Sequence, residues 1–373
     1  MPGLPSNRDH PGILVAQDLR QLAGEGGIRA LYPLRADQVQ PSSLDLRLGA
    51  RAWQLQCSFL PGAGGIAAKL GRLAIEEVKL HPENPVVLRE GGVYLVELEE
   101  VLELPAEVWG RANPKSSSGR LDVFVRLLTE EGYSFDTVPA GYHGKLYLEV
   151  TPQSFHVGVR RGDTLGQLRL ARGRPRLAVP EMEQLQASNP VVYWSDGRPA
   201  PVADLDTPGI EMSVDLHEGD EGVVGYAAQR FRPPIDLRRR DLDRRRYWTP
   251  IPAERSGEGF VLEPEQFYIF ATRERLRIPP DLCAELVPFD ATKGELRTHY
   301  AGFIDSGFGV DDSGRGARLV LEIRTHDVPF LLEHGQPLFR IELLRNRAVP
   351  DTLYGTAGSN YQMQGLKLAK QFG

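Results

Sequence analysis

The sequence predicts a mainly β protein in which one barrel-like domain occurs twice in tandem. The first observation is an internal repeat, because four short segments recur in the same order 170 to 174 residues downstream. The second is the frequency of turn-forming residues, 39 glycines and 29 prolines among 373 residues, which exceeds average usage. The third is an alternation of apolar and polar residues, typical of strands with one buried face. Short strands joined by frequent turns favour an antiparallel barrel or sandwich.

The repeat indicates an internal duplication. The paired segments are 43–46 with 213–216, 104–105 with 278–279, 146–150 with 319–323, and 161–165 with 334–338. One such similarity would carry no weight, but four at nearly one offset indicate two homologous units. We therefore expect two domains, 1–190 and 205–373, separated by a polar, proline-containing run over 188–208.

Strand patterns dominate within each half. Tyr94, Val96 and Leu98 alternate with glutamates, and residues 146–150 show the same alternation. A helical pattern is convincing only over 17–23, ahead of the first predicted strand.

Charge and cysteine content exclude several classes of protein. The formal net charge of −6 argues against a generic nucleic-acid or cationic membrane binder. Only Cys57 and Cys283 occur, which excludes a disulfide framework and a multi-cysteine zinc site and suits a reducing compartment. No segment approaches 18 apolar residues, and the first residues lack a hydrophobic signal core. We expect a cytoplasmic protein with neither nucleic acid nor membrane as partner.

Two segments imitate known cofactor motifs. Residues 62–67 read GAGGIA, the form of a dinucleotide-binding loop, but Pro61 precedes them and no strand–helix alternation follows, so we expect a β-loop. His81 and Glu83 form half of a zinc deaminase signature whose cysteine half is absent. Neither segment predicts a cofactor site.

A basic run lies in the second half. Residues 238–240 and 244–246 are all arginine, and Asp241 and Asp243 interrupt them. We expect a solvated loop, with an anion-binding or subunit-contact surface as the alternative.

The densest group of phosphate-compatible residues is the segment 115–120. It combines three hydroxyls, a glycine and two cations without a carboxylate. Such a turn can surround phosphate oxygens, and an arginine can add a bidentate contact. An ordinary serine-rich turn is the alternative from composition alone. The residues of the predicted phosphate turn are Lys115, Ser116, Ser117, Ser118, Gly119 and Arg120.

Four blocks of the chain, taken in order, carry a family resemblance. They read QPSSLDLRLG at 40–49, KSSSGR at 115–120, AGFIDSGFG at 301–309 and LVLEI at 319–323. This order resembles the dCTP deaminase branch of the trimeric dUTPase-like family. That family shows a Q-P-x-S-x-D-L-R-L-G strand, an R-S-S-x-x-R phosphate turn, a T-A-G-x-I-D-P-G-F hairpin and an L-E strand. The resemblance covers both halves and hence most of the chain.

The resemblance implies two dUTPase-like barrels of the β-clip or jelly-roll-like kind. It also implies zinc-independent deamination of dCTP to dUTP and ammonia, with Mg²⁺ carried only by the triphosphate. Such chemistry needs water at C4 of cytosine and a proton for the ring or the departing ammonia, so one carboxylate must serve as base and then acid. Glu149 and Glu322 stand where the family keeps that glutamate, each in an apolar strand. A solvent-facing glutamate is the alternative for either.

The two halves depart from the family pattern in opposite ways. The first keeps the phosphate turn but lacks the hairpin. The second keeps the hairpin, but its turn carries Asp290 and Glu295, which would repel a triphosphate. We therefore expect one site between the halves, with Glu322 favoured over Glu149. The hairpin residues expected to bind the pyrimidine side are Tyr300, Ala301, Phe303 and Asp305.

The end of the sequence resembles the family's C-terminal lid, a Tyr followed by Y-x-x-Q-x-G. The corresponding residues are Tyr354, Tyr361 and Gln364, although the glycine comes one residue early. Lys367 or Lys370 could meet phosphate. A disordered terminus is the alternative.

Three functions remain open from the sequence. The main expectation is a dCTP deaminase that forms a homo-oligomer. The alternative is a dUTP diphosphatase or a bifunctional enzyme, since Asp305 stands where that branch activates water. A non-catalytic nucleotide sensor is the third.

Overall fold

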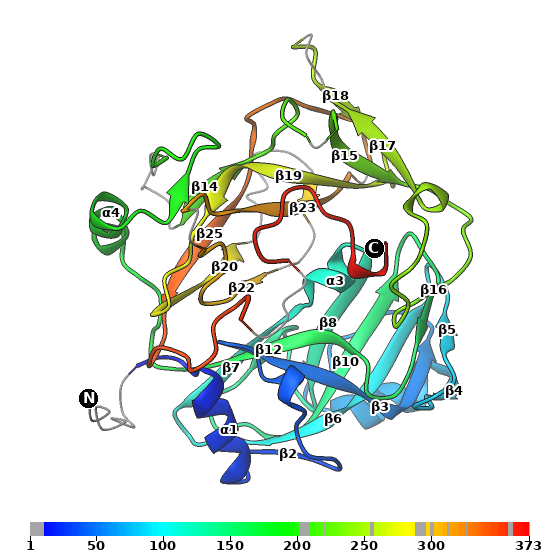
Figure 1. Cartoon of the computed structure of the whole chain (residues 1–373). Helices are drawn as coiled ribbons and strands as arrows, with labels where there is room; N and C mark the ends of the chain where they lie inside the picture. The colour runs from blue at the N-terminus through cyan, green and yellow to red at the C-terminus, as the bar shows by residue number, and fades with distance from the viewer. Residues whose placement is uncertain are drawn as a thin grey trace.

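The computed structural model contains two β-rich bodies that pack against each other (Figure 1). It describes residues 11–200, 209–219, 221–253, 257–287, 296–298, 302–311, 314–325, 327–356 and 361–372. In chain order, with η marking a 3-10 helix, the elements of the first body are β1 (Gly12–Ile13), α1 (Ala16–Gly24), β2 (Ile28–Ala30), η1 (Ala36–Gln38), β3 (Leu44–Leu55), α2 (Gly65–Leu73), β4 (Ala74–Lys79), β5 (Val86–Leu88), β6 (Val93–Glu103), β7 (Val108–Pro114), α3 (Ser116–Gly119), β8 (Val123–Thr129), β9 (Thr137–Val138), β10 (His143–Pro152), β11 (Val157–Val159) and β12 (Thr164–Arg172).

The second body follows a short helix. Its elements are α4 (Val179–Ser188), β13 (Val192–Tyr193), β14 (Ile210–Ser213), β15 (Val223–Ala228), β16 (Ile235–Asp236), η2 (Arg244–Arg246), β17 (Trp248–Pro252), β18 (Phe260–Leu262), β19 (Phe267–Leu276), β20 (Leu282–Val287), β21 (Leu296–Thr298), β22 (Phe303–Ile304), β23 (Ala317–Thr325), β24 (Phe330–Leu332), β25 (Pro337–Arg345) and η4 (Lys370–Phe372).

The same strand pairings occur in both bodies. In the first, β5 pairs with β11, β6 with β10 and β7 with β12, all antiparallel. In the second, β18 pairs with β24, β19 with β23 and β20 with β25 in the same sense. Buried positions alternate along the second half of β6, whereas the first six residues of β19 are all buried. The prediction of a mainly β fold built by duplication is confirmed.

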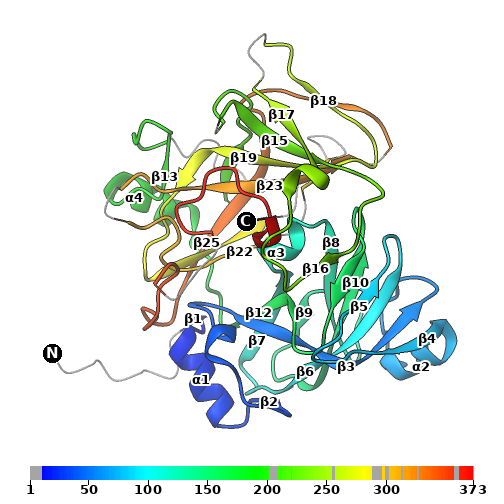
Figure 2. The same cartoon turned by 45° about the vertical axis from the view of Figure 1, so that its right-hand side comes forward.

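One hydrophobic core cluster extends across both repeats, and the second repeat has a further cluster of its own. The first repeat's core cluster also contains Trp248 and Phe267 of the second repeat, and Leu368 and Phe372 of the C-terminal segment. That segment runs between the two bodies beside α3 in both views (Figures 1 and 2). Burial of this apolar surface holds the repeats together.

A strand of the second repeat also extends a sheet of the first. Strand β16 pairs in parallel with β11, so that Ile235 lies opposite Val157. The Arg160 guanidinium donates to both carboxylate oxygens of Asp236 at 2.6 and 2.8 Å. The strand pairing and the bidentate ion pair fix the start of the arginine-rich run against the first repeat.

The predicted first helix is confirmed, since α1 spans Ala16–Gly24 and buries Leu19 and Leu22. The β-loop expected over 62–67 is wrong, because α2 begins at Gly65. The helix forms because Ile66 and Leu70 place apolar side chains on one face, which packs against Trp53 in a small outer cluster. No dinucleotide-type strand–helix–strand unit surrounds it.

Helix α4 joins the second repeat's core through Met182, as do Val191 and Val192. The chain therefore enters that core before the end of the polar run over 188–208. The domain boundaries at 190 and 205 stay a prediction. Among the described residues, no helix has the length and apolar character needed to cross a membrane.

Candidate active site

A cavity of about 630 Å³ lies between the two repeats. The first repeat contributes residues near η1, the turn α3 and the start of β12. The second repeat contributes the arginine-rich run, strand β22 with its following turn, and part of β23. The C-terminal segment supplies the remaining wall. The cavity is thus built by both halves of the chain.

Strand β23 brings Glu322 against the turn of the first repeat. A Cβ added to Gly119 would lie 2.1 Å from Oε2 of Glu322, so only a glycine permits this approach. The Glu322 side chain is buried, and neither carboxylate oxygen has a hydrogen-bond partner among the described residues. Glu322 does not itself line the cavity, whereas Leu319 and Val320 of the same strand do.

Burial raises the pKa of Glu322 well above its ordinary value. The positive charge of Arg120 opposes this rise, and the negative charge of Asp122 adds to it. A neutral carboxyl group is the form that a desolvated site favours. A buried carboxyl group with a raised pKa therefore lies at the meeting point of the two repeats.

Arg120 links the turn to the C-terminal segment. Its two terminal nitrogens donate to the Lys367 carbonyl at 2.7 Å and to Oε1 of Gln364 at 2.8 Å. The guanidinium also stacks on the Tyr361 ring, 3.9 Å from its centroid. The two terminal nitrogens of Arg120, which we expected to bind phosphate, are thus engaged by protein groups. This geometry favours a role in holding the C-terminal segment and placing positive charge near Glu322.

The other residues of the turn line the cavity or support it. Lys115 forms an ion pair with the buried Asp45, whose pKa burial raises while Lys115 lowers it. Ser118 donates to the Leu165 carbonyl at 2.9 Å. The hydroxyls of Ser116 and Ser117 line the cavity and make no hydrogen bond within the described part of the chain, so they are available to a ligand.

The hairpin of the second repeat supplies the apolar side of the cavity. Phe303 and Asp305 both line it, whereas Tyr300 and Ala301 lie outside the described residues. Asp305 accepts hydrogen bonds on one oxygen from Ser42 at 2.6 Å and from Arg169 at 3.3 Å. Because these contacts already engage Asp305, its geometry does not favour the diphosphatase alternative.

The C-terminal segment is well packed over residues 361–372. Tyr361 and Gln364 are buried, and the Gln364 amide donates to the Arg318 carbonyl at 3.1 Å. Tyr354 lines the cavity with its ring 5.6 Å from that of Phe308. Phe372 packs edge-on against Trp248 at 5.9 Å. The segment is anchored in the shared core and differs in this from a lid that only covers the site.

Glu149 occupies a different environment from Glu322. It is buried, but the register of β8 and β10 places Arg126 opposite it. Arg126 donates to Oε1 of Glu149, from Nε at 3.1 Å, and its guanidinium lies over the Phe135 ring. Glu149 therefore has a charged partner, which Glu322 lacks among the described residues, and the choice of Glu322 over Glu149 stays a prediction.

The arginine run is only partly the solvated loop that we expected. Arg239 and Arg245 are exposed and pair with the aspartates of the run itself. Arg238 instead pairs with Asp163 of the first repeat, and Arg240 lines the cavity. Arg238 and Arg240 are also exposed, as expected for a solvated loop, but β16 docks the run on the first repeat, a contact that local sequence does not encode. The sequence also did not show that Arg240 has no carboxylate within ion-pair distance in the part of the chain that the structure describes.

Comparisons with known proteins agree with this arrangement. The family models for the N-terminal and C-terminal domains of 2'-deoxycytidine 5'-triphosphate deaminase (DCD) match residues 10–174 and 179–372. A protein of Sulfurisphaera tokodaii named dCTP deaminase is 33% identical over 164 residues, which cover 43% of this chain and 79% of that protein. A Methanoculleus marisnigri protein named "dCTP deaminase, dUMP-forming" is 30% identical over 158 residues, 42% of this chain and 78% of that protein. The crystal structure of the Agrobacterium tumefaciens 2'-deoxycytidine 5'-triphosphate deaminase superposes with a TM-score of 0.84 at 40% identity, covering 92% of this chain and 100% of that one.

Proposed function

Because the chain belongs to the 2'-deoxycytidine 5'-triphosphate deaminase family, we propose that it hydrolyses dCTP to dUTP and ammonia in the cavity between its repeats. The observation that carries this proposal is Glu322, a buried carboxyl group with a raised pKa and no partner among the described residues. Such a group next to a substrate-sized cavity is a candidate for acid–base catalysis.

Glu322 would act twice in the reaction. The ionised form of Glu322 first accepts a proton from the water whose oxygen attacks C4 of cytosine, and it passes that proton to ring nitrogen N3. In the resulting adduct Glu322 then accepts the proton of the new C4 hydroxyl and delivers it to the amino group, so that ammonia leaves as C4 becomes a carbonyl. A raised carboxyl pKa favours the two steps in which Glu322 returns the proton. The charge of Arg120 stabilises the anionic form of Glu322 during the cycle.

The remaining walls would hold the nucleotide. Lys115, Ser116 and Ser117 offer a cation and two hydroxyls to phosphate oxygens, while Phe303 and Tyr354 offer apolar surface to the base and sugar. Mg²⁺ would enter as part of the substrate, bound to the triphosphate. Among the described residues, no three His, Cys, Asp or Glu side chains lie close enough to hold a metal ion. We propose a zinc-independent reaction, so chelation followed by excess Mg²⁺ should restore full activity.

The direct test is ammonia release from dCTP by matched glutamine variants. Glu322→Gln keeps the shape of the side chain but cannot carry the proton, so turnover should fall by roughly 10² to 10⁴ with little change in nucleotide affinity. Glu149→Gln is the control and should keep most of the turnover. If Glu149→Gln is inactive and Glu322→Gln remains active, the assignment is inverted.

The same assay addresses the alternatives. Resolving the products separates dUTP from dUMP and so tests the diphosphatase function, and a nucleotide sensor would bind dCTP without turnover. A cytoplasmic location and a homo-oligomer belong to the proposal as well. Light scattering of the pure protein measures the oligomer.

A further inference from the structure

The arginine run and the C-terminal segment form one structural unit at the cavity. The Leu242 amide donates to the Gln371 carbonyl at 3.0 Å, and the Gln371 side chain donates to the Leu237 carbonyl at 2.9 Å. Arg240 and Lys370 lie next to these bonds, and both line the cavity. Two elements far apart in sequence thus bring two cations to one wall.

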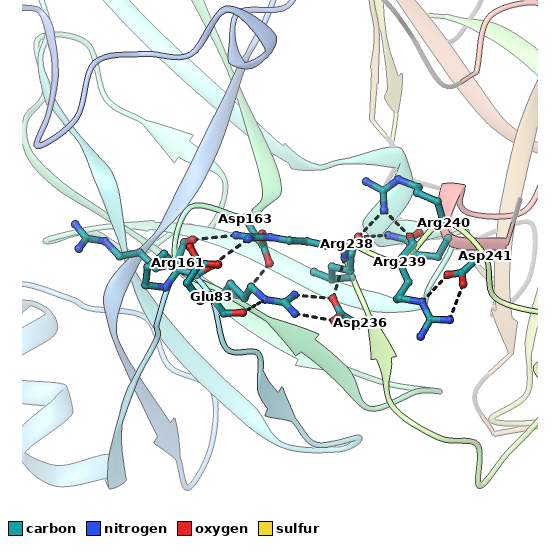
Figure 3. A network of polar contacts seen from close by, with 12 residues as sticks. Glu83, Arg161, Asp163, Asp236, Arg238, Arg239, Arg240 and Asp241 are labelled. Carbon is teal, nitrogen blue, oxygen red and sulfur yellow. Dashed lines mark hydrogen bonds and ion pairs between the residues drawn. The ribbon is translucent and has the colours of Figure 1, made fainter.

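The run is held firmly enough to position a side chain. Arg238 reaches across to Asp163 of the first repeat at 2.8 Å, while Arg239 pairs with Asp241 on the outer side (Figure 3). The buried Leu237 anchors the run in the shared core. The terminal nitrogen Nη1 of Arg240 donates to the carbonyls of Leu237 at 2.8 Å and Arg239 at 2.6 Å, which orients the guanidinium and leaves Nε and Nη2 for a ligand.

The charges of the cavity wall do not balance. Each carboxylate on the wall already has a cation: Arg35 with Asp37, Lys115 with Asp45, Arg238 with Asp163, and Arg169 with Asp305. Among the described residues, no carboxylate lies within ion-pair distance of Arg240 or Lys370. The two cations therefore form a positive excess on one wall of a protein whose net charge is −6.

The cavity wall is an electrostatically unfavourable environment for the charged form of Lys370. Burial lowers its pKa to about 8, and repulsion by Lys115 and Arg240 adds to the effect. Asp45 and Asp163 face the same group and oppose the shift. An anion between these cations would remove the repulsion, and a phosphate group has the charge and the acceptor oxygens to do so.

We propose that Arg240 and Lys370 form a subsite for the terminal phosphates of the nucleotide, and that Arg240 thereby selects a triphosphate over a monophosphate. The inference rests on the proposed function for the identity of the nucleotide. It assigns a specificity-determining role to a residue of the second repeat that lies outside the phosphate turn of the first.

The test compares Arg240→Gln with Arg239→Gln. Both remove one arginine charge from neighbouring exposed positions, but Arg239 is paired with Asp241 and absent from the cavity wall. Arg240→Gln should raise KM for dCTP by about 10- to 100-fold, the loss of one charge-assisted contact, with kcat within about twofold. The inhibition constant of dCMP should not change. Arg240→Lys should recover part of the affinity, and Arg239→Gln should behave as wild type.

Binding of inorganic tripolyphosphate, measured by calorimetry, gives a readout that needs no turnover. Its affinity should fall at least tenfold in Arg240→Gln and in Lys370→Gln, with unchanged melting temperatures. An equal loss for dCMP and dCTP, no loss at all, or the same loss in Arg239→Gln would overturn the subsite. If Arg240→Gln lowers the melting temperature, the tripolyphosphate affinity of Lys370→Gln, which lies on the separate C-terminal segment, tests the subsite instead. Wild-type protein that binds tripolyphosphate but releases no ammonia from dCTP would refute the proposed function and leave the subsite standing.

Discussion

Gly119→Ala probes the contact on which the site depends, because Gly119 lies directly against the carboxyl group of Glu322. The new Cβ would lie 2.1 Å from Oε2, whereas ordinary contacts begin near 3.4 Å, so the oxygen must retreat by about 1.3 Å. Glu322 is fully buried, so the surrounding core resists the movement. A misplacement of about 1 Å can cost a catalytic group roughly 10²-fold in rate. We expect kcat to fall about a hundredfold.

The same substitution should cost little stability. Overpacking costs about 1–3 kcal/mol, and the reduced freedom of the unfolded chain returns about 0.4–1 kcal/mol. Steady-state ammonia release and thermal melting measure the two effects separately. Gly71→Ala in α2 is the matched control, because its Cβ would meet nothing within 4 Å, so activity should be unchanged. Gly119→Ala with wild-type kcat and an unchanged melting temperature would refute the placement of Glu322 or its role.

Three further outcomes follow from buried charges. Burial raises the folded-state pKa of Glu322 above its unfolded value of about 4.3. Wild-type stability should therefore fall as the pH rises from about 4.3 towards the folded-state pKa. Across that window the melting temperature of Glu322→Gln should rise relative to that of the wild type. Lys370, with a pKa of about 8, should lose its charge above that pH, so KM for dCTP should increase there in the wild type and not in Lys370→Met. Arg324→Met removes the Arg324 partner of buried Asp122 and should destabilise the protein by about 3–5 kcal/mol, measured by urea unfolding; a loss below 1 kcal/mol would contradict the buried pair.

The repeat and its strands were readable from the sequence because they depend on local pattern. The alternation around Tyr94 needs only neighbouring residues, and so does the helical pattern of 17–23. Helix α2 was missed because glycines precede it and its apolar face matters only against Trp53, which folding brings to it. The contacts of the arginine run with the first repeat could not be predicted for a related reason. Its pairing with Asp163 crosses between repeats, and contacts at that sequence distance leave no local signal.

The candidate site was likewise predictable from the sequence only in part. The sequence favoured Glu322 over Glu149 because the second half keeps the hairpin motif and the first half keeps only the phosphate turn. The partner of Arg120 could not be foreseen, because the identity of the groups that satisfy a buried guanidinium depends on how the C-terminal segment packs. Lys370 looked like one of two lysines in a terminal segment, and only the fold separates it from Lys367, whose carbonyl rather than its charge meets Arg120.

The ion pair between Arg126 and Glu149 has a consequence for how such a chain can change over time. In a ring of identical subunits, one codon sets the same residue at every interface, so an arginine that neutralised the glutamate would abolish all sites together. Here the two glutamates are encoded separately, and Arg126 affects only one of them. A substitution at Arg126 can therefore change the stability of the first repeat without altering the surroundings of Glu322 in the second.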